Sequence, residues 1–238
     1  MTTPVLMHWT ETFNDCGPNP AGFLCSLSPE ARKALAAIAY MATYPDGSTL
    51  FSEQETPRGV FVLLRGRVKV TMTSAEGKTL ILRIARPGDV LGLSAVINGQ
   101  PHQATAETLE NCQFCFVKRE SFLGFLRAYP EASMQAAKQM GSAYRMACDQ
   151  VRALGLLHSA PRKLAGFLLD WAASSQPAKP GISAKLTLTH EEIGQMIGAS
   201  RETVTRTLAD FKHQRLAMLK GSTLVIQNKP VLQQFAEV

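Results

Sequence analysis

Long hydrophobic runs are missing from this 238-residue sequence. Its apolar stretches are short and interrupted, far below the roughly 20 residues that a membrane-spanning helix needs. The first 16 residues also lack the basic start followed by an apolar stretch that is typical of a secretory signal. We therefore expect a cytoplasmic protein with no membrane segment.

Cysteine and histidine are scarce. The chain has 5 cysteines, and this small, odd number excludes a disulfide scaffold and favours reduced thiols, some of them potential sensors. The 5 histidines (8, 102, 158, 190 and 213) are scattered without the spacing of metal ligands or of a nucleophile–base pair. We therefore expect no enzyme activity.

The remaining composition, with 45% hydrophobic and 18% charged residues, is ordinary for a globular protein. Charge is distributed unevenly: from Ala160 onward there are ten Lys and Arg against six Asp and Glu, within a total net charge of +6. A mildly basic C-terminal third suits a polyanion such as nucleic acid, although it also fits an ordinary solvated surface.

The N-terminal half changes its pattern twice. Residues 1–27 are expected to be irregular, and a short helix should run from a cap at Ser28 to about Tyr40. Residues 44–117 then contain short apolar or alternating runs separated by glycine turns, which indicates a β-barrel or β-sandwich. The expected strands are 60–64, 68–72, 79–84 and 113–117.

A long helix is predicted over residues 131–158. Small and apolar residues recur along it at alternating steps of three and four, which forms a heptad seam. A second apolar stripe that includes Met140 flanks this seam. We expect one stripe to pack on the β-domain and the other on a second copy of the chain; an ordinary amphipathic helix within a monomer is the alternative. The expected dimer seam contains Met134, Ala137, Gly141, Tyr144, Cys148 and Val151.

Residues 186–226 contain the most informative pattern. After a further helix at 159–175, Thr189 followed by Glu192 forms a capping box that opens a helix at 190–197. A Gly-Ala turn follows, and Ser200 caps a second helix at 201–212. Two short helices joined by a glycine-containing turn predict a helix-turn-helix, and residues 216–219 and 223–226 predict the hairpin of a wing.

The second of these helices has an outward face suited to DNA. Val204, Leu208 and Phe211 repeat at inward positions, which leaves polar residues facing out at the N-terminal end, where such a helix reaches base edges. Arginine can pair with guanine and glutamate with cytosine, whereas hydroxyls near helix starts suit phosphates. Two solvated surface helices are the alternative. The expected DNA-binding residues are Thr189, Ser200, Arg201, Glu202, Thr203, Thr205 and Arg206.

The stretch Thr-His-Glu-Glu-Ile-Gly-Gln-Met-Ile-Gly-Ala-Ser-Arg-Glu-Thr-Val-Thr-Arg (189–206) closely resembles the DNA-reading motif of the Crp/Fnr family of transcription regulators. The segments Gly66-Arg67-Val68-Lys69 and Pro87-Gly88-Asp89, with Gly77, resemble the cyclic-nucleotide-binding roll of the same family. The order of roll, long helix and winged domain matches as well, so the resemblance covers nearly everything after residue 28.

This resemblance implies an α+β fold with a double-stranded β-helix (β-roll), a long dimerisation helix and a C-terminal winged helix-turn-helix. The implied divisions are an irregular segment at 1–27, a sensory roll at 28–130, a dimerisation helix at 131–158 and a DNA-binding domain at 159–238. The implied partners are double-stranded DNA, a second copy of the chain and RNA polymerase. Arg201, Glu202 and Arg206 match the positions that read TGTGA-type half-sites in a palindrome.

The expected effector pocket departs from the family pattern. The family holds cyclic AMP with a Gly-Glu pair for the ribose and an Arg followed by Ser or Thr for the phosphate. Here Leu93 stands in place of the glutamate and His102 in place of the arginine. Because histidine carries at most a partial charge at neutral pH, cyclic AMP is disfavoured and the effector stays open. The candidate pocket residues are Gly92, Leu93, Ser94, His102 and Gln103; His102 and Gln103 could equally be exposed loop residues.

The iron–sulfur branch of the family is a second possibility for the sensor. Cys16, Cys25 and Cys115 occupy the regions where that branch places ligands, but they are one short of four and their spacing differs. Cys112 could supply the fourth ligand, but it is three residues from Cys115, and residues three apart on a straight strand point to opposite faces. A thiol switch between Cys16 or Cys25 and Cys115, or inert thiols, are the alternatives; a thioredoxin-like Cys112–Cys115 pair is disfavoured because no helix N-terminus follows.

In a different class of function, the chain would be a ligand-binding module whose helix-turn-helix contacts protein. Binding to DNA that weakens steeply with salt would favour the DNA-binding function over this one, because counterion release accompanies phosphate contacts.

Overall fold

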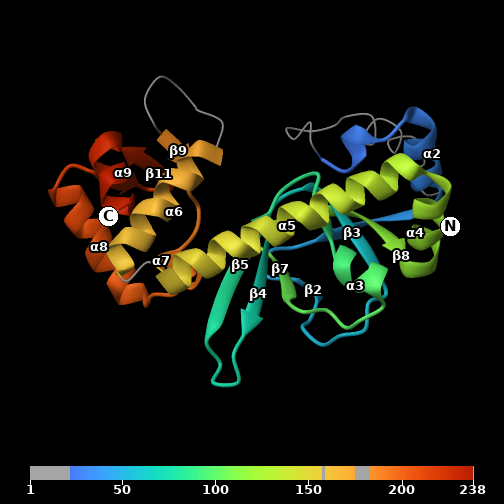
Figure 1. The fold of residues 1–238 in the computed structure, drawn as a ribbon, viewed down its shortest axis with the longest axis horizontal. Coiled ribbons are helices and arrows are strands. Elements are labelled where there is room, and N and C mark those ends of the chain that lie inside the picture. The colour runs from blue at the N-terminus through green and yellow to red at the C-terminus, as the bar shows by residue number, and fades with distance from the viewer. Residues whose placement is uncertain (1–21, 157–158, 175–182, 238) are drawn as a thin grey trace. The chain divides into compact units, whose positions relative to one another are not determined.

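A computed structural model describes residues 22–156, 159–174 and 183–237 of the chain. The chain divides into two compact units, one formed by residues 1–77 and 82–146 and the other by residues 78–81 and 147–238. The expected α+β architecture is confirmed, with two β-sheets in the first unit and a winged helical arrangement in the second (Figure 1). Within the described residues, no helix combines the length and the apolar character that a membrane crossing requires.

The first unit begins with a 3-10 turn (η1, Leu24–Ser26) and a helix (α2, Pro29–Ile38). Ser28 caps α2 as expected, since its side chain accepts a hydrogen bond from the amide of Ala31. The helix ends two residues earlier than expected, because Ala39 and Tyr40 start strand β1 (Ala39–Tyr44). Strand β1 pairs antiparallel with β8 (Cys112–Lys118) along its whole length.

Two four-stranded sheets form the β-roll. One has the order β1-β8-β3-β6 and the other the order β2-β7-β4-β5. The remaining strands of the roll are β2 (Thr49–Phe51), β3 (Gly59–Arg65), β4 (Val68–Thr73), β5 (Thr79–Ala85), β6 (Val90–Leu91) and β7 (Thr105–Thr108). The four strands expected from the sequence are all present as β3, β4, β5 and β8, each one or two residues longer than expected.

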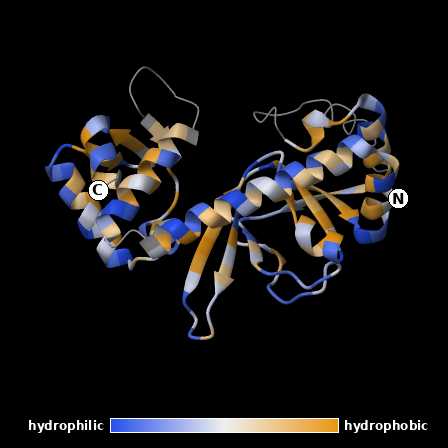
Figure 2. Ribbon diagram, in the orientation of Figure 1, coloured by the Kyte–Doolittle hydropathy of each residue, from blue (hydrophilic) through white to orange (hydrophobic). Residues whose placement is uncertain are grey.

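Alternation along β3 and β8 sends side chains into two separate cores, and both strands are strongly hydrophobic (Figure 2). Phe61 and Phe114 point between the two sheets, into a cluster that we call the roll interior, together with Phe51, Leu63, Val68, Ala85, Leu91, Ala106 and Cys112. Val62 and Cys115 point to the opposite face, into a cluster that we call the outer core. Four helices pack on the outer core: α2, α3 (Leu93–Asn98), α4 (Arg119–Ala128) and the start of α5 (Pro130–Leu156).

A short helix, α3 (Leu93–Asn98), connects β6 to β7. It starts directly after Gly92, which has a φ of 80°, a left-handed backbone that glycine adopts without strain. The residues that follow α3 lead through His102 into β7 and bring this histidine to the edge of the roll interior.

The second unit contains the helices α6 (Ala160–Ser174), α7 (His190–Ile197), α8 (Arg201–His213) and α9 (Lys229–Glu237). Strands β9 (Ser183–Lys185), β10 (Ala217–Lys220) and β11 (Thr223–Ile226) form an antiparallel sheet in the order β10-β11-β9. The wing expected from the sequence is present as the β10–β11 hairpin, and β9 adds a third strand that the sequence did not indicate. The core of the second unit contains Leu164, Leu168, Ile193, Val204, Phe211 and Leu224.

Candidate functional site

The ends of the two helices of the helix-turn-helix are stabilised by capping residues that the sequence predicts. Thr189 and Glu192 form the expected capping box at the start of α7, with each side chain bonded to the backbone of the other residue. The turn needs glycine twice. Gly198 has a φ of 66°, and a Cβ on Gly194 would lie 2.5 Å from the carbonyl oxygen of Ala199. Only glycine therefore lets the turn close against α7.

Helix α8 separates its residues into a buried and an exposed face. Val204, Leu208 and Phe211 are buried as expected, with 1%, 7% and 1% of their surfaces exposed. Arg201 and Glu202 at the N-terminal end and Arg206 one turn later are exposed. A hydrogen bond from its own backbone amide, with a further one from Ser200, lowers the pKa of the Glu202 carboxyl, which is therefore ionised at neutral pH.

The hydroxyl residues of the expected DNA-binding set have partners within the protein. The Ser200 side chain accepts from the amide of Thr203 and lies 3.0 Å from the Thr203 hydroxyl. The hydroxyl of Thr205 donates to the carbonyl of Arg201 and lies 2.8 Å from Nδ1 of His190. Thr189 is engaged in its capping box. The Glu202 carboxylate also accepts from its own amide and from Ser200. Arg201 and Arg206 extend outward at the exposed face of α8.

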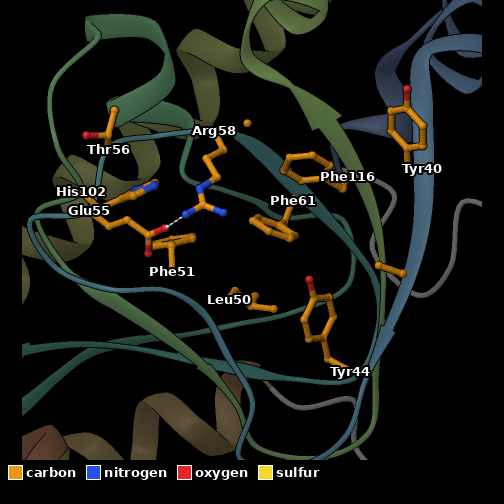
Figure 3. Close-up of a pocket in the computed structure, with 12 residues that line it drawn as sticks. Tyr40, Tyr44, Leu50, Phe51, Glu55, Thr56, Arg58, Phe61, His102 and Phe116 are labelled. Carbon is orange, nitrogen blue, oxygen red and sulfur yellow. Dashed lines mark ion pairs between the residues drawn. The ribbon is translucent and has the colours of Figure 1, made fainter.

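A pocket of about 330 Å³ opens into the roll interior (Figure 3). Its walls are mainly aromatic: Phe61 lies 4.9 Å from Phe116 and 6.3 Å from Phe51, measured between ring centroids. Arg58 lies at the pocket mouth and pairs with Glu55, with a nitrogen–oxygen distance of 3.5 Å. The lining residues are Tyr40, Ala42, Tyr44, Leu50, Phe51, Glu55, Thr56, Arg58, Gly59, Phe61, His102 and Phe116.

His102 lies in the wall of this pocket and is 4% exposed. Its ring stacks on Phe51 with centroids 3.9 Å apart, and its backbone is bonded to Gln54 and Glu55. Burial lowers the pKa of His102, and the weaker influence of the Glu55 carboxylate in the opposite direction does not offset it. The imidazole is therefore neutral at neutral pH.

The structure does not gather the other four candidate pocket residues around this cavity. Leu93 is buried in the outer core, and Ser94 and Gln103 are exposed. Gly92 lies behind His102, since a Cβ at this position would be 3.2 Å from the His102 ring. The expectation of an exposed loop was thus wrong for His102 and holds for Gln103. Sequence reasoning missed Phe51, Phe61 and Phe116, which lie on three strands that are far apart in the sequence.

The outward face of α5 carries the expected dimer seam. Met134, Tyr144 and Val151 are 60%, 72% and 70% exposed, and Ala137 and Gly141 are exposed between them. Cys148 is half-buried. The opposite face contributes Ala132, Ala136 and Met140 to the outer core. The first part of the helix therefore has one apolar side that is covered by the first unit and one that is exposed.

Each of the two units matches a domain that is known from other proteins. Residues 41–129 match the family model described as a cyclic nucleotide-binding domain, and residues 162–235 match the model described as a Crp-like helix-turn-helix domain. The chain belongs to the Crp/Fnr family of transcription regulators. Members of this family are DNA-binding regulators rather than enzymes.

Individual Crp/Fnr relatives cover most of the chain. A CRP-like cAMP-activated global transcriptional regulator of Mycobacterium tuberculosis is 28% identical over 87% of this chain and 93% of its own length. The cAMP-activated global regulator CRP of Salmonella typhimurium is 29% identical over 77% of this chain and 87% of its own length.

Solved structures of the family share the fold. FixK2 from Bradyrhizobium japonicum aligns with a TM-score of 0.74 and 24% identity, covering 84% of this chain and 98% of FixK2. A mutant of CooA from Carboxydothermus hydrogenoformans aligns with a TM-score of 0.73 and 25% identity, covering 86% of this chain and 90% of CooA.

Two of the cysteines that the comparison with the iron–sulfur branch of the Crp/Fnr family concerns, Cys112 and Cys115, lie in different cores. Cys112 lies in the roll interior and Cys115 in the outer core, on opposite faces of β8 as expected. Burial raises the pKa of Cys112, and it raises the pKa of Cys115 to about 12. Cys25 is half-buried, and Cys16 lies outside the described residues. Among the described residues, no three His, Cys, Asp or Glu side chains are grouped as metal ligands would be.

Proposed function

We propose that this Crp/Fnr regulator binds DNA as a homodimer and reads a palindrome of TGTGA-like half-sites about one helical turn apart. The observation that carries the proposal is the exposed group of Arg201, Glu202 and Arg206 at the N-terminal part of α8. In a helix-turn-helix this part of the second helix enters the major groove, and a two-fold dimer presents two such helices at that spacing.

The three side chains have the chemistry that base readout needs. The arginines can donate two hydrogen bonds to O6 and N7 of a guanine, and the ionised carboxylate of Glu202 can accept from N4 of a cytosine. Glu202 and Arg206 are four residues apart, so they lie on the same face of α8 and can contact neighbouring base pairs. Glu202 is an ionised acceptor at neutral pH, as any glutamate with an ordinary or lowered pKa is.

Dimerisation is supported by the exposed stripe on α5. Large apolar side chains such as Tyr144 and Val151 are uncommon in such a regular row on a surface that faces water, and the heptad spacing matches a parallel helix pair. Small residues at Ala137 and Gly141 allow the two helices to approach closely. We accordingly assign dimerisation to residues 131–158, sensing to residues 28–130 and DNA binding to residues 159–238.

The effector is proposed to differ from cyclic AMP. The M. tuberculosis and S. typhimurium relatives are named cAMP-activated. In this chain the position of the ribose-binding glutamate is Leu93, whose side chain lies in the outer core, and the position of the phosphate-binding arginine is the neutral His102. Neither residue supplies the charge that a cyclic phosphate in an aromatic pocket requires.

A mobility-shift assay tests DNA binding, and sedimentation of the same proteins tests dimerisation. The wild-type protein should bind the palindrome more tightly than a single half-site or a scrambled duplex, with affinity that falls steeply as salt is raised. Tyr144→Asp should sediment as a monomer and lose this preference, because it places an acid in the middle of the seam. Met146→Asp is the matched control: it also adds an acid at an exposed apolar residue of α5, but outside the seam.

Two results would contradict the proposal. A Tyr144→Asp protein that still sediments as a dimer would place the subunit contact elsewhere. Wild-type binding that is equally tight on scrambled DNA, or absent on every duplex, would favour a helix-turn-helix that contacts protein instead.

A further inference from the structure

We propose that the pocket in the roll interior binds a small planar aromatic carboxylate of one or two rings, with the ring between the aromatic walls and the carboxylate on Arg58. The inference rests on the proposed function, since it names the class of effector for the roll assigned to sensing. Of the pocket residues that this inference uses, only His102 stands at a position by which the family holds a cyclic nucleotide.

The walls of the pocket set the shape of the ligand. Three phenylalanines, Phe51, Phe61 and Phe116, line one continuous surface, and Tyr44 meets Phe61 edge to face at 75° (Figure 3). Aromatic rings pack favourably on other rings in stacked or edge-to-face geometry, so a planar apolar ligand suits this surface. The volume of about 330 Å³ is at the lower end for small-molecule sites, which limits the ligand to one or two rings.

The mouth of the pocket sets the charge of the ligand. The Arg58 side chain is 84% exposed, and among the described residues its ion pair is with Glu55 alone, at 3.5 Å. The Glu55 carboxylate is more fully engaged, because it also accepts from the amide of Ser52 at 3.1 Å. The guanidinium has five N–H donors, and most of them remain available for a second carboxylate. An anionic end group therefore fits the mouth better than a cationic one.

His102 supplies a neutral polar contact inside the pocket. No hydrogen bond of its ring nitrogens is found among the described residues, and neither nitrogen is buried without a partner. Because the His102 ring lines the pocket, its nitrogens are available to bond a hydroxyl or carbonyl substituent on a ligand ring. Because the stacked imidazole is neutral, the inner part of the site suits an uncharged ring rather than a phosphodiester.

Calorimetric titration of the full-length protein with 1-naphthoate and its uncharged analogue 1-naphthamide tests the proposal. The wild-type protein should bind 1-naphthoate more tightly than 1-naphthamide or cyclic AMP. Arg58→Gln should weaken 1-naphthoate about tenfold or more and leave 1-naphthamide nearly unchanged, because only the carboxylate loses its charge-assisted bonds. Arg65→Gln is the control, since Arg65 is exposed on the same roll but does not line the pocket. Ala42→Trp should fill the cavity and weaken both compounds.

Different outcomes would contradict the role of Arg58, the class of ligand or the proposed function. Equal binding of 1-naphthoate to the wild type and to Arg58→Gln would overturn the assignment of the carboxylate. Tighter binding of cyclic AMP than of 1-naphthoate, or no binding of 1-naphthoate and benzoate at millimolar concentration, would overturn the ligand class. A protein that binds 1-naphthoate but fails to recognise the palindrome would leave this inference in place and contradict the proposed function instead.

Discussion

Nδ1 of His190 lies 2.8 Å from Oγ1 of Thr205 and joins the first residue of α7 to the outward face of α8. The Thr205 hydroxyl donates its proton to the carbonyl of Arg201, so it can only accept from the histidine. The histidine is thereby held with its proton on Nδ1. Thr205 thus has a role in positioning the two helices, and its hydroxyl has no proton left for a base.

Thr205→Val should remove this link while keeping the shape and the helix propensity of the side chain. The expected loss is about 0.5–1 kcal/mol of unfolding free energy, because the freed groups are exposed and can bond to water. A double-mutant cycle with His190→Ala, followed by urea unfolding, should give a coupling energy of similar size. Strictly additive losses would mean that the two side chains do not interact in solution. The preferred DNA sequence of Thr205→Val should match that of the wild type.

Cys115 should resist modification in the folded protein. With a pKa of about 12, only about one thiol in ten thousand is ionised at pH 8, and the thiolate is the reactive form. Iodoacetamide labelling followed by peptide mass spectrometry should show Cys115 reacting orders of magnitude more slowly in the folded protein than in urea. Labelling at the same rate in both conditions would revive a thiol switch that uses this residue.

His102 should make the stability of the protein depend on pH. Its pKa is lowered by burial in the folded protein, so between that pKa and 6.5 the unfolded chain binds more protons than the folded one. Stability should therefore be lost as the pH falls through and below about 6.5, and regained as it rises. His102→Phe keeps the stacking on Phe51 and removes the titration, so urea midpoints measured from about pH 5 to pH 8 should show a shallower slope. An unchanged slope would assign the pH dependence to other groups.

The helix-turn-helix could be predicted almost residue by residue, because its signals are local. The capping box of Thr189 and Glu192, the cap at Ser200 and the glycine at 198 each define a helix end by themselves. The observed bounds of α7 agree with expectation, and α8 ends one residue later, at His213. Base-reading candidates follow from such bounds, since the inward positions of Val204 and Phe211 determine which side chains are left outside.

The pocket could not be predicted in this way, because its residues come from strands that are far apart in the sequence. Phe51, Phe61 and Phe116 lie on β2, β3 and β8, and their meeting depends on the register of two sheets. Strands β2 and β6 have only three and two residues, too few to show a period, and both were missed. The resemblance named His102 as a pocket residue but did not indicate the packing that buries it against Phe51.

Base readout by Arg206 is the central claim, and binding-site selection from random duplexes tests it most directly. The wild type should select a palindrome of TGTGA-like half-sites. Arg206→Ala should lose about 1–3 kcal/mol of binding free energy and relax its preference at a single guanine in each half-site. Lys212→Ala, which changes an exposed cation in the last turn of the same helix, should instead weaken all sequences alike and reduce the salt dependence. If the wild type and Arg206→Ala select the same motif with the same stringency, Arg206 does not read a base and the assignment of α8 is contradicted.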